Sequence, residues 1–221
     1  MIRMVISSFY NTLIDKEEAI PTSTMLEIDK LRNKGITFSI CTNRSKEDVL
    51  YYNHDYPFID YILSYNGNYI YDISKDKIIY SKPLTKSIIK EIEKIYKDYK
   101  ITYYEEDNKT YKLEIKVKKK DINLIDKLNN LDISKSIFTY NKEYFIEITS
   151  HSIIDGINKL KIPTTEIVSI IGNNSEKELI NIIEKTYIVS NSSKELKEKS
   201  NYKTKSNNSH GVEQVIKKYN Q

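Results

Sequence analysis

TSTMLEIDKLRNKGITFSICT, residues 22–42, predicts an amphipathic helix that leads into a short buried strand. Apolar residues at helical spacing mark the buried face of the helix: Met25, Ile28 and Leu31. Thr22 or Ser23 is expected to cap its N-terminus, and Gly35 to end it. A second apolar run, RMVISSF at 3–9, precedes the helix. Strand, helix and strand in this order form a βαβ unit, which implies a parallel sheet with a right-handed crossover.

Helices and strands alternate in the same way towards both ends of the chain. A third strand is predicted at 61–66, and Asn66-Gly67 turns it into a fourth at 68–72. Beyond residue 149 the expected elements are a helix at 152–161, a strand at 168–172, a helix at 176–185, a strand at 186–191, and helices at 193–200 and 210–219. These elements extend the α/β pattern to the end of the chain.

The central region, residues 83–149, has a different pattern. Leu113, Ile115 and Val117 alternate with charged residues, which is typical of a sheet with one wet face. The expected order is a helix at 85–99, strands at 101–106 and 111–119, a helix at 120–131, and a hairpin of strands at 136–141 and 143–149. We therefore predict an α/β, Rossmann-like core of residues 1–82 and 150–221, into which an αββαββ domain of residues 83–149 is inserted.

Composition excludes several classes of protein. Among 221 residues, 35 Lys and Arg face 31 Asp and Glu, and the longest basic run is KKK at 118–120, so no nucleic-acid partner is expected. The apolar runs are too short for a membrane span, and the N-terminus lacks the features of a signal peptide. A single cysteine, Cys41, excludes a disulfide framework and a Cys-cluster metal site. A reduced, cytoplasmic setting is the expectation.

Several short motifs together resemble one family. They are SFYNTL at 8–13, SICTNR at 39–44, SYNG at 64–67, IIGNN at 170–174 and NYKTKSNNSHGVEQVIKKY at 201–219. In order and spacing they resemble the haloacid dehalogenase (HAD) superfamily, specifically the Cof-type phosphatases with a small type-IIB cap. The resemblance spans almost the whole chain and implies a Rossmannoid core with a parallel sheet, and a cap formed by the inserted α+β domain.

The resemblance also implies a chemistry. In such phosphatases one Asp attacks phosphorus, a second Asp two residues later acts as acid and base, a Lys holds the charges, and carboxylates bind Mg²⁺. The pattern D-x-D-G-T-L places Ser8 at the nucleophile and Tyr10 at the acid/base, with Asn11 at the glycine. Thr12 and Leu13 match. No Asp-x-Asp occurs elsewhere in the chain that could replace this motif.

The other family positions are changed as well. Asp155, before Gly156, stands at the Lys position. The metal motif G-D-x-x-N-D falls on Gly172, Asn173, Glu176 and Lys177. Thr42, Arg44, Asn66 and Gly67 keep the family residue, whereas Asn43 replaces a glycine. Replacement of every charged member at once predicts lost catalysis, because such sites fail when single members are removed.

The first functional hypothesis is therefore a non-catalytic HAD-like protein. It would bind a small phosphorylated molecule or a protein partner, without metal or other cofactor. The expected binding residues are Ser8, Thr12, Thr42, Asn43, Arg44, Asn66 and Gly67. Tyr10 either plugs the former phosphate pocket or points to solvent, and Lys177 either pairs with Asp155 or lies free.

Two alternatives remain open at this point. One is a weak Mg²⁺-dependent phosphohydrolase acting on small esters such as sugar phosphates. It would need carboxylates from outside the family motif: Asp15, Asp155 and Glu176. The other is a structural or scaffolding protein. It would be favoured by a cleft filled by Tyr10 and by a stable oligomer.

Overall fold

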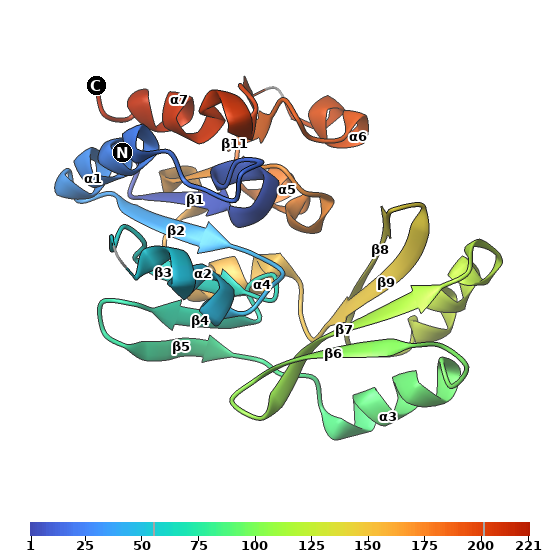
Figure 1. Cartoon of the computed structure of the whole chain (residues 1–221). Coiled ribbons are helices and arrows are strands. Elements are labelled where there is room, and N and C mark those ends of the chain that lie inside the picture. The colour runs from blue at the N-terminus through green and yellow to red at the C-terminus, as the bar shows by residue number, and fades with distance from the viewer. Residues whose placement is uncertain (55, 201) are drawn as a thin grey trace.

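The described residues form two β-sheets (Figure 1). The structure is a computed structural model, and it describes residues 1–54, 56–200 and 202–221. The large sheet has the strand order β12-β11-β10-β1-β2-β3-β4-β5, and the small sheet has the order β6-β7-β9-β8. We call the part that carries the large sheet the core and the part that carries the small sheet the cap. This is the mixed α/β fold, with a mainly parallel sheet and a separate antiparallel one, that the sequence predicts.

The core strands are β1 (Met4–Ser8), β2 (Thr37–Cys41), β3 (Tyr61–Ser64), β4 (Tyr69–Asp72), β5 (Lys77–Ser81), β10 (Ile167–Ile171), β11 (Lys185–Val189) and β12 (Tyr202–Thr204). The core helices are α1 (Thr22–Asn33), α2 (Lys46–Asn53), α4 (Ile153–Lys159), α5 (Leu179–Ile182), α6 (Lys194–Glu198) and α7 (Gly211–Lys217), with short turns η1 (Phe9–Leu13), η3 (Thr164–Glu166), η4 (Asn174–Glu176) and η5 (Asn207–Ser209). The cap has β6 (Ile101–Glu106), β7 (Lys109–Val117), β8 (Ser134–Tyr140), β9 (Glu143–Thr149), α3 (Lys86–Ile95) and η2 (Lys119–Leu128).

The predicted βαβ unit lies at the centre of the large sheet. All five residues of β1 are buried, and the strand pairs in parallel with β2 on one side and β10 on the other. Gly35 takes a φ of +76°, as expected of a residue that ends a helix. The predicted cap by Thr22 or Ser23 is wrong, because Pro21 occupies the N-cap position and makes no side-chain hydrogen bond. The fixed φ of proline favours this start without a polar cap.

Helices cover both faces of the large sheet. One apolar cluster joins β1 to residues of α1 and α7, including Ile28 and Ile216. A second cluster joins the other face to α4, α5 and α6 through Ile157, Leu179 and Leu196. Alternate residues of β1 therefore pack into the apolar clusters on opposite faces of the sheet, as expected for a strand that is buried on both faces.

Some elements differ from their predictions. The expected helix at 120–131 is the 3-10 helix η2, and the expected helix at 176–185 is reduced to α5, preceded by a 3-10 turn. Sequence periodicity predicted a buried face in both segments, but it does not distinguish a 3-10 turn from an α-helix in so short a run. The edge strands β5 and β12 were not predicted. Four of the five residues of β5 are exposed, so its sequence lacks the alternation of a half-buried strand.

The cap packs around its own apolar cluster. Leu113, Ile115 and Val117 of β7 contact α3 and η2 on one face of the small sheet. The other face carries charged and aromatic side chains, and it is the face that contacts the core.

The predicted boundaries, 1–82 with 150–221 for the core and 83–149 for the cap, stay a prediction. Among the described residues, no helix is both long and apolar enough to cross a membrane.

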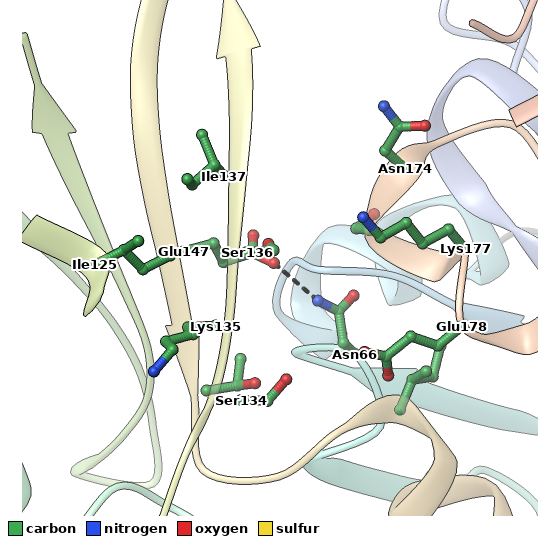
Figure 2. Close-up of a pocket in the computed structure, with 13 residues that line it drawn as sticks. Asn66, Ile125, Ser134, Lys135, Ser136, Ile137, Glu147, Asn174, Lys177 and Glu178 are labelled. Atoms are coloured by element: carbon green, nitrogen blue, oxygen red, sulfur yellow. Dashed lines mark hydrogen bonds between the residues drawn. The ribbon is translucent and has the colours of Figure 1, made fainter. Parts of the chain in front are cut away.

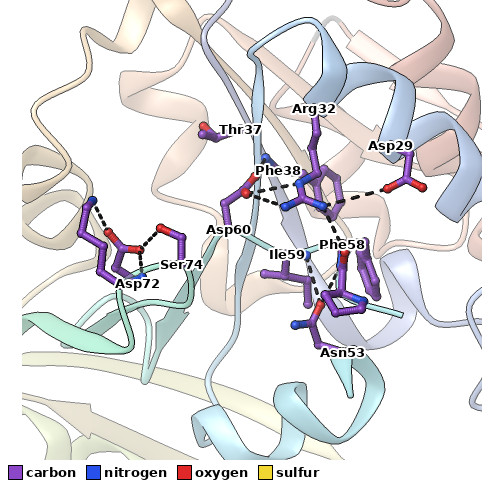
Figure 3. Close-up of polar contacts among 12 residues, drawn as sticks. Asp29, Arg32, Thr37, Phe38, Asn53, Phe58, Ile59, Asp60, Asp72 and Ser74 are labelled. Atoms are coloured by element: carbon purple, nitrogen blue, oxygen red, sulfur yellow. Dashed lines mark hydrogen bonds and ion pairs between the residues drawn. The ribbon is translucent and has the colours of Figure 1, made fainter. Parts of the chain in front are cut away.

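A polar cluster fastens the far edge of the large sheet, where β2 begins (Figure 3). Arg32 of α1 donates from Nε and Nη2 to Oδ1 of Asp60, at 3.2 and 3.0 Å. The other carboxylate oxygen of Asp60 accepts from the backbone N–H of Phe38 at 2.8 Å. A hollow of about 340 Å³ lies beside these residues. Because the charges satisfy one another, the cluster joins α1 to the sheet and leaves no free group for a ligand.

Gly156 is required where α4 meets the turn after β3. A Cβ at this position would lie 2.5 Å from the carbonyl oxygen of Gly67 and 2.8 Å from its Cα. Because both are backbone atoms, we expect Gly156→Ala to lower the free energy of unfolding by about 1–3 kcal/mol. Urea unfolding measures this, with Asn158→Ala on the exposed side of α4 as the matched control. Equal stability of the two variants would show that the backbones move apart without strain.

Candidate functional site

The predicted site residues lie at the ends of four parallel strands. Ser8 ends β1, Thr42 to Arg44 follow β2, Asn66 and Gly67 follow β3, and Asn173 follows β10. In open α/β sheets the loops at the carboxyl ends of the strands form the ligand crevice. A cavity of about 360 Å³ lies between this edge and the cap (Figure 2).

The first group in this crevice is Ser8, Tyr10 and Asn173. Ser8 is fully buried; among the described residues its Oγ has no partner at ordinary hydrogen-bond geometry, but it lies close enough to the Glu176 carboxyl to lower the pKa of that group. The carbonyl oxygen of Tyr10 accepts a hydrogen bond of 2.9 Å from Nδ2 of Asn173. Oδ1 of Asn173 in turn accepts from Nδ2 of Asn11 at 3.4 Å. The asparagine amide therefore bridges the two loops at the point where the family resemblance implies a metal.

Thr12 and Gly172 lie beside this group. Oγ1 of Thr12 is buried and unpartnered. A Cβ on residue 172 would lie 2.3 Å from that oxygen and 2.9 Å from the carbonyl oxygen of Asn11. Glycine is therefore needed here for the two loops to approach, which explains why this position of the motif is unchanged.

The Tyr10 ring lies against Arg44. The guanidinium carbon is 4.4 Å from the ring centroid, and Phe9 meets the ring edge-on at 5.1 Å. Burial raises the pKa of Tyr10, although Arg44 opposes the shift. The Tyr10 side chain is therefore held against the Arg44 guanidinium, so it does not fill the crevice by itself and does not extend freely into solvent.

Thr42 and Ser45 serve local structure. Oγ1 of Thr42 accepts from the backbone N–H of Arg44 at 3.2 Å. Oγ of Ser45 accepts from the N–H of Asp48 at 3.3 Å and so caps α2. An anion at this helix end would compete with both bonds.

Glu147, a cap residue of β9, reaches into the crevice. Its Oε1 accepts from Nδ2 of Asn66 at 2.9 Å, and its Oε2 from Nδ2 of Asn43 at 3.3 Å. Nζ of Lys112, on β7, lies 3.5 Å from Oε2. Lys112 is almost wholly buried, and Nζ is 3.7 Å from the ring centroid of Tyr104. Burial lowers the pKa of Lys112, even though Glu147 and Glu114 act against the shift.

A second group of contacts joins the cap to the core. Lys46 of α2 forms an ion pair of 3.0 Å with the buried Glu106 of β6, which also accepts from the hydroxyl of Tyr65 at 3.0 Å. The Tyr65 ring stacks on Tyr111 of the cap at 5.3 Å, and Tyr69 meets Tyr111 edge-on. Tyr65 and Tyr69 are therefore used inside the molecule and do not form an exposed aromatic face.

The charged residues of this contact were not found from the sequence. Lys112 and Glu147 lie on strands whose alternation predicted one wet face. That pattern does not show that the wet face meets another domain. The buried pairing of lysine and glutamate depends on tertiary contacts that span 35 residues between Lys112 and Glu147.

Glu176 is a second buried carboxylate of the crevice, besides Glu147. It is 2% exposed; Oε1 accepts from Oγ of Ser175 at 2.8 Å, and Oε2 has no partner. Burial raises its pKa to about 7, and the negative charge of Glu147 adds to this effect. At neutral pH the group is thus divided between its neutral and charged forms.

The other predicted carboxylates do not join Glu176. Oδ1 of Asp15 accepts from the backbone N–H of Glu17 and of Ala19, within its own loop. Asp155 is half exposed and accepts from Oγ of Ser152 at 2.9 Å. Lys177 forms no ion pair with it among the described residues. Within the same residues, no cluster of three His, Cys, Asp or Glu could hold a metal ion.

Comparison with known proteins shows the family of this chain. The profile described as haloacid dehalogenase-like hydrolase matches in two overlapping segments, residues 9–161 and 104–216. A search of curated proteins finds no match.

Solved structures share the fold over nearly the whole chain. A phosphatase of the HAD superfamily from Bacteroides thetaiotaomicron has a TM-score of 0.86 at 12% identity, with 99% of this chain and 95% of that chain covered. A haloacid dehalogenase-like hydrolase from B. subtilis has a TM-score of 0.84 at 13% identity, with coverages of 98% and 99%. A subclass IIB sugar phosphatase has a TM-score of 0.82 at 15% identity, with coverages of 98% and 98%. At such identities the likeness shows the fold alone.

Proposed function

Because this chain belongs to the haloacid dehalogenase-like hydrolase family and is one of its Cof-type members, we propose that it binds a small phosphorylated molecule without hydrolysing it. The binding place would be the cavity between core and cap. The observation that carries this proposal is the amide of Asn173, which donates to the backbone carbonyl of Tyr10 where the family's metal site would be.

The residues at this point do not fit Mg²⁺. The ion prefers an octahedron of hard oxygen ligands that includes one or two carboxylates. Here the Tyr10 carbonyl already accepts the Asn173 amide, and Ser8 offers only a hydroxyl. Two buried carboxylates lie in the crevice: Glu176 has a pKa raised by its burial, and both oxygens of Glu147 accept from asparagine amides. A metal at this place would need charge that the loops do not supply, so we propose that the protein uses none.

The family positions for the nucleophile, the acid/base and the lysine also carry other residues. Ser8 offers a hydroxyl in place of the attacking carboxylate, and this hydroxyl would have to lose its proton before it could attack; the carboxyl beside it is that of the buried Glu176. Tyr10 would have to donate and accept protons, but burial raises its pKa above an already high value. Asp155, at the lysine position, brings negative charge and points to a serine of its own helix start. On these grounds we propose that Ser8, Tyr10 and Asp155 do not carry out the roles that the family assigns to their positions.

The cavity supports binding of a small polar molecule. Its lining is rich in hydroxyl and amide groups, among them Ser134, Ser136, Thr149, Asn174 and Ser175. Lys177 extends its amino group towards the cavity, and this amino group forms no ion pair or hydrogen bond among the described residues (Figure 2). Ser8 and Thr12 do not line this cavity but are buried at the same edge of the sheet, and among the described residues Oγ of Ser8 and Oγ1 of Thr12 have no partner at ordinary hydrogen-bond geometry. One structural neighbour is a sugar phosphatase, so sugar phosphates are the first ligands to test.

Calorimetric titration without Mg²⁺ tests the proposal. We expect at least one sugar phosphate to bind the wild type, and Thr12→Val to weaken that binding about fivefold to tenfold through loss of one hydroxyl. Thr37→Val is the control, because Thr37 lies at the opposite end of the sheet and donates to the carbonyl of Arg3. Absence of binding by the whole panel, or equal effects of the two variants, would contradict the proposal.

A further inference from the structure

We infer that Asn43, Asn66 and Lys112 form an oxyanion site, and that the cap fills this site with the carboxylate of its own Glu147. Two of the three donors, Asn43 and Asn66, are core residues at which the sequence predicted ligand binding. In the structure they bind a side chain of the cap. The carboxylate thus stands where the anionic group of a ligand would be recognised.

The geometry is that of a bound carboxylate. Each oxygen of Glu147 faces a different asparagine, with Nδ2–O distances of 2.9 Å to Asn66 and 3.3 Å to Asn43. Figure 2 shows the Asn66 bond crossing from the core loop to the cap strand. Nζ of Lys112 is 3.5 Å from the same oxygen that Asn43 contacts. Glu147 is 4% exposed, so its charge depends on these donors rather than on water.

The loops that carry the two asparagines are tied together by a bond that does not involve Glu147. The backbone N–H of Asn66 donates to the carbonyl of Thr42 at 2.9 Å, which ties the two asparagine loops together. Lys112 lies over the ring of Tyr104, on the strand next to its own. If Glu147 left, the two asparagine amides would lose their acceptor, and the buried ammonium group of Lys112 would keep only Glu114, at 4.0 Å. Such a site favours a small oxyanion.

In this arrangement Glu147 of the cap and the anionic group of a ligand compete for the same three donors. A carboxylate or phosphate group that bound the three donors would displace Glu147 and weaken the hold of the cap on the core. By linkage, a cap held less firmly would bind that anion more strongly. This point rests on the proposed function, since it names the part of the ligand that the cleft recognises. The site itself can be tested with simple anions.

The test is chemical rescue of Glu147→Ala. Acetate and inorganic phosphate are titrated separately, at constant ionic strength set with chloride, and the thermal midpoint of unfolding is measured. Acetate matches the removed carboxylate, and phosphate represents the larger oxyanion. An anion at ten times its dissociation constant shifts the folding equilibrium about elevenfold, which raises the midpoint by a few °C. We expect at least one of the anions to produce this rise.

Glu143→Ala is the matched control. Glu143 lies on the same strand but is half exposed, and it pairs with Lys116 at the surface. Neither this variant nor the wild type should respond to the anions beyond a general salt effect. The double variant Glu147→Ala with Lys112→Met should lose the response, since the charged donor is gone. Equal responses in all four proteins would overturn the inference.

Glu147→Gln covers the case in which Glu147→Ala does not fold. It keeps the side-chain volume and removes the charge, so Lys112 lacks its closest acidic partner. We expect phosphate to stabilise this variant more than it stabilises the wild type, and an equal response would contradict the site. These results are independent of the search for a sugar phosphate. If the anions stabilise the Glu147 variants but no sugar phosphate binds the wild type, the anion site is supported and the proposed function is rejected.

Discussion

Replacing Lys112 by methionine is expected to lower the free energy of unfolding by about 3–5 kcal/mol. The side chain is 2% exposed and lies 3.5 Å from Glu147 and 4.0 Å from Glu114. Its removal leaves the buried carboxylate of Glu147 with two amide donors but without its ion-pair partner. The loss is large because the remaining charge is separated from water, not because the pair itself is strongly favourable.

A second variant separates these two explanations. The pKa of Lys112 is lowered by burial, so the fold gains little from the ammonium charge itself. We therefore expect Lys112→Met combined with Glu147→Gln to recover most of the stability, because neither member is then left unpaired. Urea unfolding of the wild type, both single variants and the double variant gives the coupling energy.

Lys116→Met is the control for this cycle. Lys116 lies on the same strand, is half exposed and pairs with Glu143 at 2.5 Å. A surface pair of this kind contributes about 0–1 kcal/mol, so its loss should be small. If Lys112→Met were no more harmful than Lys116→Met, the buried pair of Lys112 and Glu147, which joins two strands of the cap, would not hold as described.

The second large effect is a gain in stability from Glu176→Gln. The pKa of this buried carboxyl rises from 4.5 to about 7, so above pH 7 the fold holds a charge that it disfavours. Each pKa unit corresponds to about 1.36 kcal/mol, which gives a gain of about 3 kcal/mol for the neutral glutamine.

The pH dependence follows from proton binding. Between pH 4.5 and 7 the folded protein holds the Glu176 proton more tightly than the unfolded chain does. The contribution of Glu176 to stability therefore falls as pH rises through this window, and it levels off above it. Glu176→Gln should equal the wild type near pH 4 and exceed it most at pH 8.

Thermal unfolding at pH 5, 6, 7 and 8 measures this difference. Glu198→Gln serves as the control, because Glu198 is mostly exposed and pairs with Lys194 at 3.8 Å. Its difference from the wild type should be small at every pH. A gain for Glu176→Gln that did not change with pH would mean that the raised pKa is not its cause.

The fold was predictable because its signals are local. The βαβ unit is marked by a helical apolar stripe between two apolar runs, and Gly35 has the positive φ that ends the helix. Asp107, Asn108, Asn141 and Lys142 also take positive φ, as the predicted cap hairpins require. Short helices such as α5 were less predictable, because a single turn carries too little periodicity.

The site was predictable only in part. Motif positions placed Ser8, Asn43, Asn66 and Asn173 at one edge of the sheet, because the ends of parallel strands meet there. The partners of these residues come from elsewhere in the fold. Glu147 and Lys112 are charged residues on strands with one polar face, and the docking of that face on the core is a tertiary event. Which charge is buried, and against which amide, is decided by that docking.

The most direct measurement is a phosphatase assay on homogeneous protein. p-Nitrophenyl phosphate and a panel of sugar phosphates are incubated with and without Mg²⁺, beside a Ser8→Asp, Tyr10→Asp double variant and a Ser8→Ala variant. The account predicts no Mg²⁺-dependent turnover by the wild type; turnover gained by the double variant would show that the phosphate pocket itself is intact. Metal-dependent turnover by the wild type that scales with protein concentration and is lost in Ser8→Ala would contradict the account.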